Sequence, residues 1–282
     1  MPGPTAKAAT TAGRVLACTA IAIAGLAATP AAAQGVNDKY WIELSGFRAS
    51  PDTKVTLSRP GQPGTKFDME SDLGLDSHEF LPGLYAGVRL GERWLITGEY
   101  YGLDRNGSKT LTRDIVFDGV TYPANVQIDS KFRSNVYRAS VGYSFIRNEH
   151  GEVGADIGLH ATNFKIDLNG QGRLGGPGLT AQNSDRSFTA PAPTLGAYGA
   201  YEIAPKVTLN GRVDWLSLKV GDYDGSILNA QASVAYNVTD MIAAGIGYRY
   251  VDYNLDVDKK NFTAKFDYKF SGPSIFLRLA FQ

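Results

Sequence analysis

The last stretch of the chain, 262-FTAKFDYKFSGPSIFLRLAFQ-282, decides the fold. From Phe262 to Phe270 every even position is apolar or aromatic, and every odd position between them is polar. A two-residue period is typical of a strand with one dry face and one wet face. After the tripeptide Ser271-Gly272-Pro273 the phase reverses. The apolar face is then carried by Ile275, Leu277, Leu279 and Phe281. Because Gly and Pro inside a strand often mark a β-bulge, we expect a bulge that re-aims the side chains without ending the strand.

Residues 1–34 have the organisation of a secretory signal. Lys7 and Arg14 supply the positive start, an apolar run of small residues follows, and Ala31-Ala32-Ala33 gives an A-x-A cleavage site. The apolar run is too short and too rich in alanine for a membrane helix, which needs about 20 apolar residues. The sequence therefore predicts a signal peptide over residues 1–33 and one domain over residues 34–282.

The composition of the remaining chain excludes several classes of function. The single cysteine, Cys18, lies inside the predicted signal, which rules out disulfides, thiol catalysis and Cys-ligated metal in the mature protein. The predicted signal holds two of the 28 basic residues and no acidic one, so 26 basic residues face 28 acidic ones. This near-neutral balance argues against nucleic acid as a partner. With 43% hydrophobic residues and 32 glycines, the composition suits a β-rich protein with many tight turns.

Ten segments between Lys39 and Gln282 show the two-residue period, and turn signals separate them. The connections after the even-numbered segments are short: Gly91-Glu92, Asn148–Gly151, Ala204-Pro205 and Thr239-Asp240. Those after the odd-numbered segments are mostly longer and richer in Gly, Pro, Asn and Asp. Short turns at one end and longer loops at the other are typical of a membrane β-barrel. Aromatic residues near the short turns predict an interfacial girdle: Tyr40, Trp94, Phe145, Tyr201, Tyr236 and Phe281.

Two of the longer connections carry specific predictions. Asp118-Gly119 has the sequence of a tight hairpin tip, and we prefer one long hairpin reaching Asp118 over a turn at Asn106-Gly107. The polar, Gly-rich stretch Asn169–Arg186 is expected to be the longest irregular loop.

The signal, the alternating strands and the terminal Leu277-Arg278-Leu279-Ala280-Phe281 together resemble the small outer-membrane β-barrel proteins of Gram-negative bacteria. The resemblance covers Lys39–Gln282. It implies an all-β fold, a transmembrane antiparallel up-and-down β-barrel of about ten strands, with eight as the alternative. It also implies location in the outer membrane, contact with its lipid and lipopolysaccharide, and help from periplasmic chaperones. The barrel-assembly machinery would read Leu277, Leu279 and Phe281, although this chain continues to Gln282, whereas the family usually ends on the aromatic residue.

A soluble, secreted β-sandwich or β-barrel is the alternative to a membrane barrel. It would bury the apolar face in a core and turn a solvent-like face outward. In this sequence the opposite face is crowded with Gly, Ser and Tyr and carries isolated charges. Small residues and paired charges favour a narrow lumen.

The charged residues of the wet face at mid-strand are the candidate site. They are Glu43, Arg89, Glu99, Arg138, Asp156, His160, Arg212, Asp214, Arg249 and Arg278, together with Glu202. A barrel of this size has a small interior that side chains largely fill. Because a lone buried charge is costly, these residues are expected to form ion-pair networks that cross-link the lumen. The alternative is a narrow polar path for small solutes or ions, with selectivity set by the same charges.

Catalysis is the least favoured alternative. His160 lies in phase with Asp156, and His78 lies beside Asp76 and Glu79, so either could act as a general base. Outer-membrane proteases place Asp and His at the outer rim, and lipid A deacylases use His and Ser on a strand, but neither pattern matches here. We expect no enzyme, no cofactor and no dedicated metal site. The acidic stretch Asp68–Asp76 offers at most weak contact with divalent cations or lipopolysaccharide. A structural or surface-exposed role in the envelope is therefore expected.

Overall fold

The computed structural model describes residues 38–173 and 178–281. Ten long strands form one sheet: β1 (Tyr40–Ser58), β3 (Glu79–Leu90), β4 (Trp94–Thr110), β7 (Gln127–Arg147), β8 (Gly151–Gly172), β9 (Thr180–Ala204), β10 (Val207–Val220), β11 (Tyr223–Asn237), β12 (Ile242–Lys259) and β13 (Phe262–Phe281). Three short strands lie between them: β2 (Phe67–Asp68), β5 (Ile115–Phe117) and β6 (Val120–Tyr122). In the described part of the chain, no helix has the length and apolar character needed to cross a membrane.

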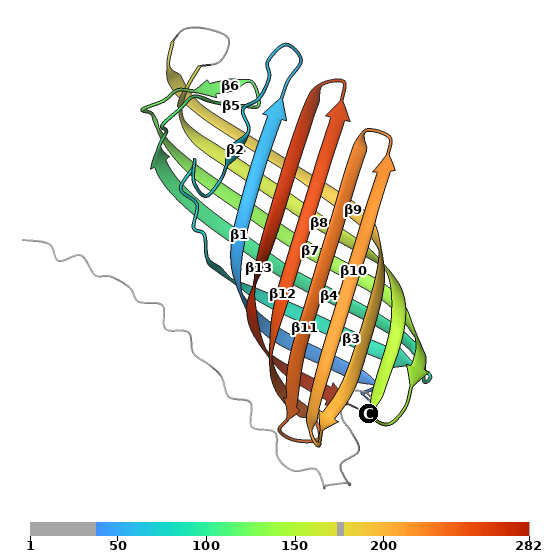
Figure 1. Cartoon of the computed structure of the whole chain (residues 1–282). Helices are drawn as coiled ribbons and strands as arrows, with labels where there is room; N and C mark the ends of the chain where they lie inside the picture. The colour runs from blue at the N-terminus through green and yellow to red at the C-terminus, as the bar shows by residue number, and fades with distance from the viewer. Residues whose placement is uncertain (1–37, 174–177, 282) are drawn as a thin grey trace, which may run out of the picture. The chain divides into compact units, whose positions relative to one another are not determined.

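The ten long strands close into a barrel (Figure 1). Each pairs antiparallel with the next along the chain, and β13 returns to pair with β1 from Tyr40↔Phe281 to Ser58↔Thr263. The predicted up-and-down barrel is confirmed, with ten strands and not eight. The predicted short turns all lie at one end, which we call the lower end. At the other, upper end the connections β1–β3, β4–β7 and β8–β9 are longer, as predicted, whereas β10–β11 and β12–β13 are joined by the two-residue turns Gly221-Asp222 and Lys260-Asn261.

Along the strands that reach into the upper half, the composition changes at one level, as β12 shows. Its outward positions are apolar or aromatic from Ile242 to Tyr250 and then polar from Asp252 to Asp258. Its inward positions change in the opposite sense, from Gly247 and Arg249 to a run of buried apolar residues, Val251, Tyr253, Leu255 and Val257. The barrel is therefore apolar outside and polar inside in its lower half. Its upper half is polar outside and apolar inside.

The predicted bulge in β13 is wrong. Tyr250↔Ser271, Arg249↔Gly272 and Tyr248↔Pro273 are successive pairs, with no shift in register between β12 and β13. Even residues point inward along the whole strand, so the reversal of phase in the sequence reflects a change of surroundings and not a change of direction. Gly272 serves another purpose, because a Cβ there would lie 1.9 Å from the carbonyl oxygen of Arg48.

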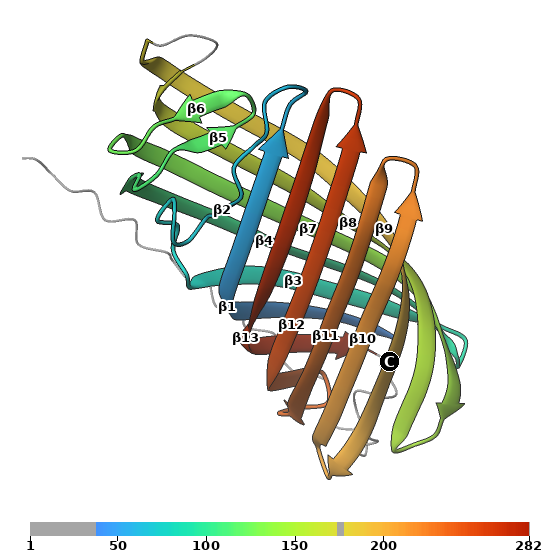
Figure 2. The same cartoon turned by 45° about the horizontal axis from the view of Figure 1, so that its top comes forward.

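In the upper half the strands separate into two facing sheets (Figure 2). β9 pairs with β10 only from Ala204 up to Leu195↔Trp215, and above that level it pairs with β8 alone. β3 likewise pairs with β4 only as far as Gly83↔Tyr101, while β4 continues beside β7. One sheet therefore holds β4, β7, β8 and β9, and the other holds β1, β13, β12, β11 and β10.

A hydrophobic core fills the space between the two sheets. Its centre is a group of rings from both sheets, in which the Phe164 and Phe266 centroids lie 4.4 Å apart and those of Phe132 and Tyr268 lie 5.6 Å apart. Residues 59–78 and 111–126, which we call the cap, add Phe67, Met69, Phe117 and Tyr122 to the same core, all almost fully buried. The interior of the upper half is thus packed like the core of a soluble domain.

The cap contains the predicted hairpin tip at Asp118-Gly119. Both residues have positive φ, 53° and 81°, as a tight two-residue hairpin requires. The predicted single long hairpin does not form, because β4 and β7 stop pairing at Thr110↔Gln127 and the chain then folds over the core as β5 and β6. Asn106-Gly107 lies inside β4 and makes no turn.

The predicted irregular loop Asn169–Arg186 is wrong for residues 169–172 and 180–186, which are strand, and residues 174–177 of the prediction lie outside the described residues. β8 continues to Gly172 and β9 begins at Thr180, with pairs such as Asn169↔Asn183. Asn169, Gln171, Asn183 and Asp185 lie on the outward face of the upper half, whereas Ser184 is buried against the Tyr122 hydroxyl. Water surrounds that face, so the strands need no apolar residues there.

Candidate functional site

Among the described residues, five arginines and five carboxylates pair with one another in the lumen of the lower half. They are Arg89, Arg138, Arg212, Arg249 and Arg278, and Glu43, Glu99, Glu152, Asp156 and Asp214. They stand on inward positions of eight strands, because the outward positions of the same strands at this level are apolar. Each of the ten forms an ion pair with at least one of the others.

Six of these charges form a continuous chain across the lumen. Arg249 donates to Glu99, and Glu99 also accepts from Arg212 at 2.6 Å. Arg212 lies 3.3 Å from Asp214, which accepts from Arg138 at 2.5 Å. Arg138 ends the chain on Asp156 at 3.0 Å. Since these residues come from five different strands, the chain ties opposite parts of the barrel together.

The other four charges form two separate pairs. Arg89 donates to Glu152 at 2.9 Å, and the Ser144 hydroxyl donates to the second oxygen of the same carboxylate at 2.9 Å. Arg278 lies directly across from Glu43 on β1 and donates to it at 2.9 Å. Positive and negative charges are therefore equal in number among these ten residues. The network leaves no excess charge to select ions of one sign.

A cavity of about 140 Å³ lies among these charged side chains. At its upper end stand Phe47, Leu81 and Tyr101, which belong to the core of the upper half. At its lower end Trp41 and Leu95 pack with Ala280 and are joined by Tyr85 and Tyr198. The volume is enough for about five water molecules and is below the range of about 300–1,000 Å³ typical of sites for drug-sized ligands.

All ten predicted mid-strand residues lie on the inner wall, but His160 stands outside the ion-pair chain. It is 1% exposed, lies directly across from Arg138, and its Nδ1 has no hydrogen-bond partner among the described residues. The expected partner, Asp156, is occupied by Arg138. Glu202 lies lower, where its carboxylate is 3.6 Å from His150.

Glu152 is the member of the network that the sequence analysis missed. In the sequence Glu152 follows the turn glycine Gly151 directly and therefore looks like part of the turn. In the structure its side chain points inward near the start of β8 and is buried. Tyr85 and Tyr198 also line the cavity and were not singled out. The sequence did contain the information, because both tyrosines alternate with the apolar residues of their strands and so belong to the inward face.

The three histidines occupy three different environments. His160 is buried in the lumen, and His150 lies in a lower turn. His78 is exposed at the upper end, where the Ser77 hydroxyl lies 3.2 Å from its Nδ1. Ser77 and His78 are neighbours in sequence, and no carboxylate contact to the His78 ring occurs within the described residues. Within the part of the chain that the structure describes, a nucleophile, a base and an orienting acid are not assembled around any of the three.

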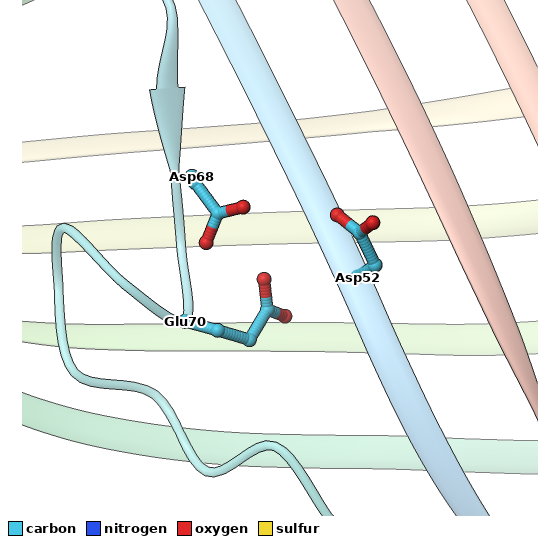
Figure 3. A group of neighbouring side chains, drawn as sticks. All are labelled: Asp52, Asp68 and Glu70. Atoms are coloured by element: carbon cyan, nitrogen blue, oxygen red, sulfur yellow. The ribbon is translucent and has the colours of Figure 1, made fainter.

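Three acidic side chains approach one another where the cap meets β1 (Figure 3). The carboxylates of Asp52, Asp68 and Glu70 can place oxygens within 4.8 Å of each other. Each already has a donor from the protein. Lys54 donates to Asp52 at 2.7 Å, the Ser71 amide donates to Asp68 at 2.8 Å, and Glu70 accepts from Arg105 and, at 2.9 Å, from the Thr53 amide. We assign no metal to this cluster.

Comparison with known proteins identifies the family. Residues 18–236 match the family model described as the outer membrane protein beta-barrel domain. The chain belongs to this family. Membership implies the outer membrane of a Gram-negative bacterium, and it confirms the resemblance inferred from the sequence. The apolar outward band of the lower half is therefore the lipid-facing surface of an outer-membrane barrel.

Solved structures share the fold at low sequence identity. The outer membrane protease OmpT from Escherichia coli has a TM-score of 0.57 and 11% identity, covering 88% of this chain and 98% of OmpT. The toluene transporter TodX of Pseudomonas putida has a TM-score of 0.36 and 11% identity, covering 86% and 90% of the two chains. Ail, the attachment invasion locus protein of Yersinia pestis, has a TM-score of 0.33 and 12% identity, covering 84% and 99%. No curated protein sequence matches the chain. The likeness to OmpT shows the fold and leaves the activity open.

Aromatic residues mark both edges of the lipid-facing band. Those predicted near the short turns are all exposed on the outer surface: Tyr40, Trp94, Phe145, Tyr201, Tyr236 and Phe281. A second set at the upper edge was not predicted: Tyr100, Tyr137, Tyr248 and Tyr250. Two girdles of this kind are typical of outer-membrane barrels, where the rings lie at the two interfaces.

Proposed function

We propose that this protein is a non-conducting, non-enzymatic component of the outer membrane, whose upper half presents a rigid folded surface outside the cell. The observation that carries the proposal is the reversal of polarity between the two halves. It gives the projecting half a hydrophobic core of its own. The lower half anchors this structure in the bilayer, and lipid and lipopolysaccharide are its proposed surroundings.

The apolar core argues against transport through the barrel. An ion or polar solute that entered the polar cavity from below would meet Phe47, Leu81 and Tyr101 and then the packed rings around Phe164. Apolar constrictions exclude water and close channels by dewetting. The narrow-pore alternative is supported only by the cavity of the lower half, which the core covers.

The charges of the lower half fit a structural role. Each of the ten carboxylate and guanidinium groups has a partner of opposite sign, and most are almost fully buried. Breaking one buried pair leaves an uncompensated charge in a medium of low dielectric. We infer that the network cross-links the barrel and is not a selectivity filter.

Planar-bilayer conductance of the refolded chain, without its predicted signal, tests this function. We expect no steady conductance from the native chain or from the Arg138→Ala and Asp214→Ala variants. Heat-modifiable gel mobility should show that the barrel inserted in each sample is folded. Steady conductance that changes with either substitution would overturn the proposal and establish the lumen as a path.

Catalysis has its own test. The folded barrel is incubated with a mixed peptide library and with lipid A, beside a His78→Ala and a His160→Ala variant. We expect no cleavage product in any sample. A product that the native barrel forms and one histidine variant does not form would show that the protein is an enzyme.

A further inference from the structure

In the upper half of the protein, β9 is the edge strand of its sheet (Figure 2). β8 pairs with β9 on one side up to the end of the strand, at Gly172↔Thr180. On the other side β9 pairs with β10 only as far as Leu195↔Trp215. Among the described residues, no other backbone group pairs with β9 above that level. Such an edge is a row of free N–H and C=O groups on which another strand can assemble.

The direction of the backbone groups on β9 follows from one hydrogen bond at its lower end. The Glu202 amide donates to the carbonyl of His150, which directly precedes β8. Backbone groups of every second residue point to the same side of a strand, and the register between β8 and β9 has no shift. Even-numbered residues of β9 therefore pair with β8. Odd-numbered residues direct their N–H and C=O groups at the open edge.

Prolines close the lower part of this edge. Pro191 and Pro193 are odd-numbered, so the N–H groups that they lack would have faced the gap and not β8. Proline is a usual means of blocking an exposed edge. Higher up, from Ala181 to Thr189, there is no proline and no bulge, and Asp185 is the one outward charge. Five amides face the gap in this part: those of Ala181, Asn183, Asp185, Ser187 and Thr189.

The facing sheet leaves apolar side chains uncovered beside the same gap. Leu218 on β10 and Tyr223 on β11 point to the same side of their sheet as the buried core residue Ile227. Their exposed fractions are nevertheless 42% and 45%. Closer to the bilayer, Leu216 on the same side of β10 packs against the core. A strand added to β9 would extend its sheet over Leu218 and Tyr223.

The open part of the edge lies above the bilayer in the proposed orientation. Thr189 is six residues above Leu195, which is about 20 Å along a strand. The occupant is a polypeptide, because an extended backbone repeats donors and acceptors at the spacing of the edge. A second copy of β9 does not fit. A two-fold axis along the membrane normal reverses the usual strand tilt of about 35–45°, so the two strands would cross at about 70–90°.

We propose that β9 binds an extended segment of another protein by strand addition along residues Ala181–Thr189. The backbone of the segment pairs with the five amides and the carbonyls of the edge, and its alternate apolar side chains cover Leu218 and Tyr223. The inference rests on the proposed function, which places this edge outside the cell, and it names the kind of partner that the upper half takes. Binding to the purified barrel does not depend on the orientation.

Peptide binding to the folded barrel in mild detergent, measured by fluorescence anisotropy, tests the proposal. The probe is a labelled synthetic peptide with the sequence of Phe262–Phe270, which alternates apolar and polar residues. The variant is Asn183→Pro with Ser187→Pro, which removes two amides from the edge and none that pairs with β8. The matched control is Asn183→Ala with Ser187→Ala, which keeps both amides. Gel mobility checks that all three barrels are folded.

The native barrel and the alanine control should bind the peptide with similar affinity, and the proline variant should bind it at least tenfold more weakly. Hydrogen exchange in the native barrel gives a second readout that needs no variant. The five edge amides should exchange at least tenfold more slowly when the peptide is bound, whereas the even-numbered amides of the same stretch should be protected throughout.

Three results would overturn the proposal: no binding to the native barrel, equal binding by the proline variant, or unchanged exchange of the edge amides. Labelling of an Asn169→Cys variant on intact cells checks the orientation separately. A failure of the proposed orientation can thus be told apart from a failure of strand addition.

Discussion

Arg138 contacts carboxylates from two different strands, Asp156 on β8 and Asp214 on β10, and all three groups are buried. Replacing Arg138 by alanine leaves both carboxylates without their main partner. We expect a loss of about 3–5 kcal/mol in the free energy of unfolding, as for other broken buried pairs. Urea unfolding in detergent, followed by gel mobility, measures it.

A matched substitution on the surface serves as the control for Arg138. Lys269 forms an exposed pair with Asp252, and its replacement by alanine should cost about 0–1 kcal/mol. Arg138→Lys should fall between the two, because an ammonium group keeps the charge but lacks the planar fork that reaches both acids. Equal losses for Arg138→Ala and Lys269→Ala would show that the lumen network does not cross-link the barrel.

The stability of the cap is expected to depend on pH through the carboxyl group of Asp72. Burial alone would raise the pKa of its carboxyl group, but the hydrogen bond from Arg113 at 2.6 Å outweighs this effect and holds the pKa below its ordinary value of 3.8. A lowered pKa in the folded state stabilises the protein above the ordinary value, and this stabilisation is lost as the pH falls through the lowered pKa. Hydrogen-exchange protection factors in residues 111–126, which correct for the intrinsic pH dependence of exchange, should therefore fall in strong acid.

The comparison for this prediction is Asp72→Asn. The amide cannot ionise, so exchange in the cap should be faster at neutral pH than in the native protein and should change less on acidification. An unchanged exchange rate in the variant at neutral pH would mean that the pair with Arg113 does not hold the cap.

At the scale of single residues, the sequence predicted which side chains point into the barrel, but it did not predict which of them form ion pairs with each other. The parity of a strand is enough to place Arg138, Asp214 and the other mid-strand charges inside the barrel. Their pairing depends on contacts such as Arg249 with Glu99, which are 150 residues apart and meet only once the ring is closed. His160 lies on the same inward face of β8 as Asp156, but the Asp156 carboxylate accepts its hydrogen bond from Arg138.

At the scale of the element, β12 allows a direct test of the reversal of polarity. Ile246 and Asn254 lie on the same outward face of this strand, below and above the level of Tyr250. Lysine at position 246 would face lipid and should cost about 2–4 kcal/mol, as expected near the middle of a bilayer. Lysine at position 254 would face water and should change stability by at most about 0.5 kcal/mol.

Folding titrations in urea with lipid vesicles would measure both β12 variants. The two sites share a strand, a face and the same substituted residue, so only their surroundings differ. Similar costs at positions 246 and 254 would contradict the assignment of the upper half to water.

The elements also explain which predictions failed. In β13 the sequence showed a reversal of polarity, which can result either from a bulge or from a change of environment along an unbroken strand. Only the register, with Arg249 opposite Gly272, separates the two. The stretch Asn169–Arg186 has the composition of a loop because strands in water do not need an apolar outer face.

At the scale of the whole molecule, the barrel must be assembled in the membrane, and Phe281 carries the corresponding prediction. Its ring is exposed on the outer surface at the end of β13, opposite Tyr40. Phe281→Ser should reduce the amount of folded barrel in the outer membrane of cells by several fold, because the resemblance gives the terminal aromatic residue a role in recognition. Refolding of the purified variant in detergent should change little.

Phe145→Ser is the appropriate comparison for Phe281→Ser. Phe145 belongs to the same lower girdle and is similarly exposed, but it lies in the middle of the chain. Quantitative blotting of membrane fractions would compare the two. Equal reductions would assign the effect to the girdle and not to the end of the chain.

The architecture as a whole could be read from the sequence, whereas the filling of its interior could not. Ten alternating segments with short and long connections predicted the number of strands and the direction of the barrel. The core of the upper half combines rings from distant strands, such as Phe132, Phe164 and Phe266, with residues of the cap. No local sequence pattern indicates that these side chains pack in the same core.

The level at which the strands exchange polarity also fixes how deep the protein sits in its membrane. On β12 the apolar outward stretch Ile242–Tyr250 corresponds to a height of about 23 Å for a tilted strand. Sliding the barrel upward would expose Ile246 and its neighbours to water, and sliding it downward would bury Asp252 and Lys269 in hydrocarbon. In a thicker bilayer the lipids around this protein must thin to meet it. The fold therefore sets the height of the apolar band, and the protein should accumulate in regions of the membrane whose hydrocarbon thickness matches that height.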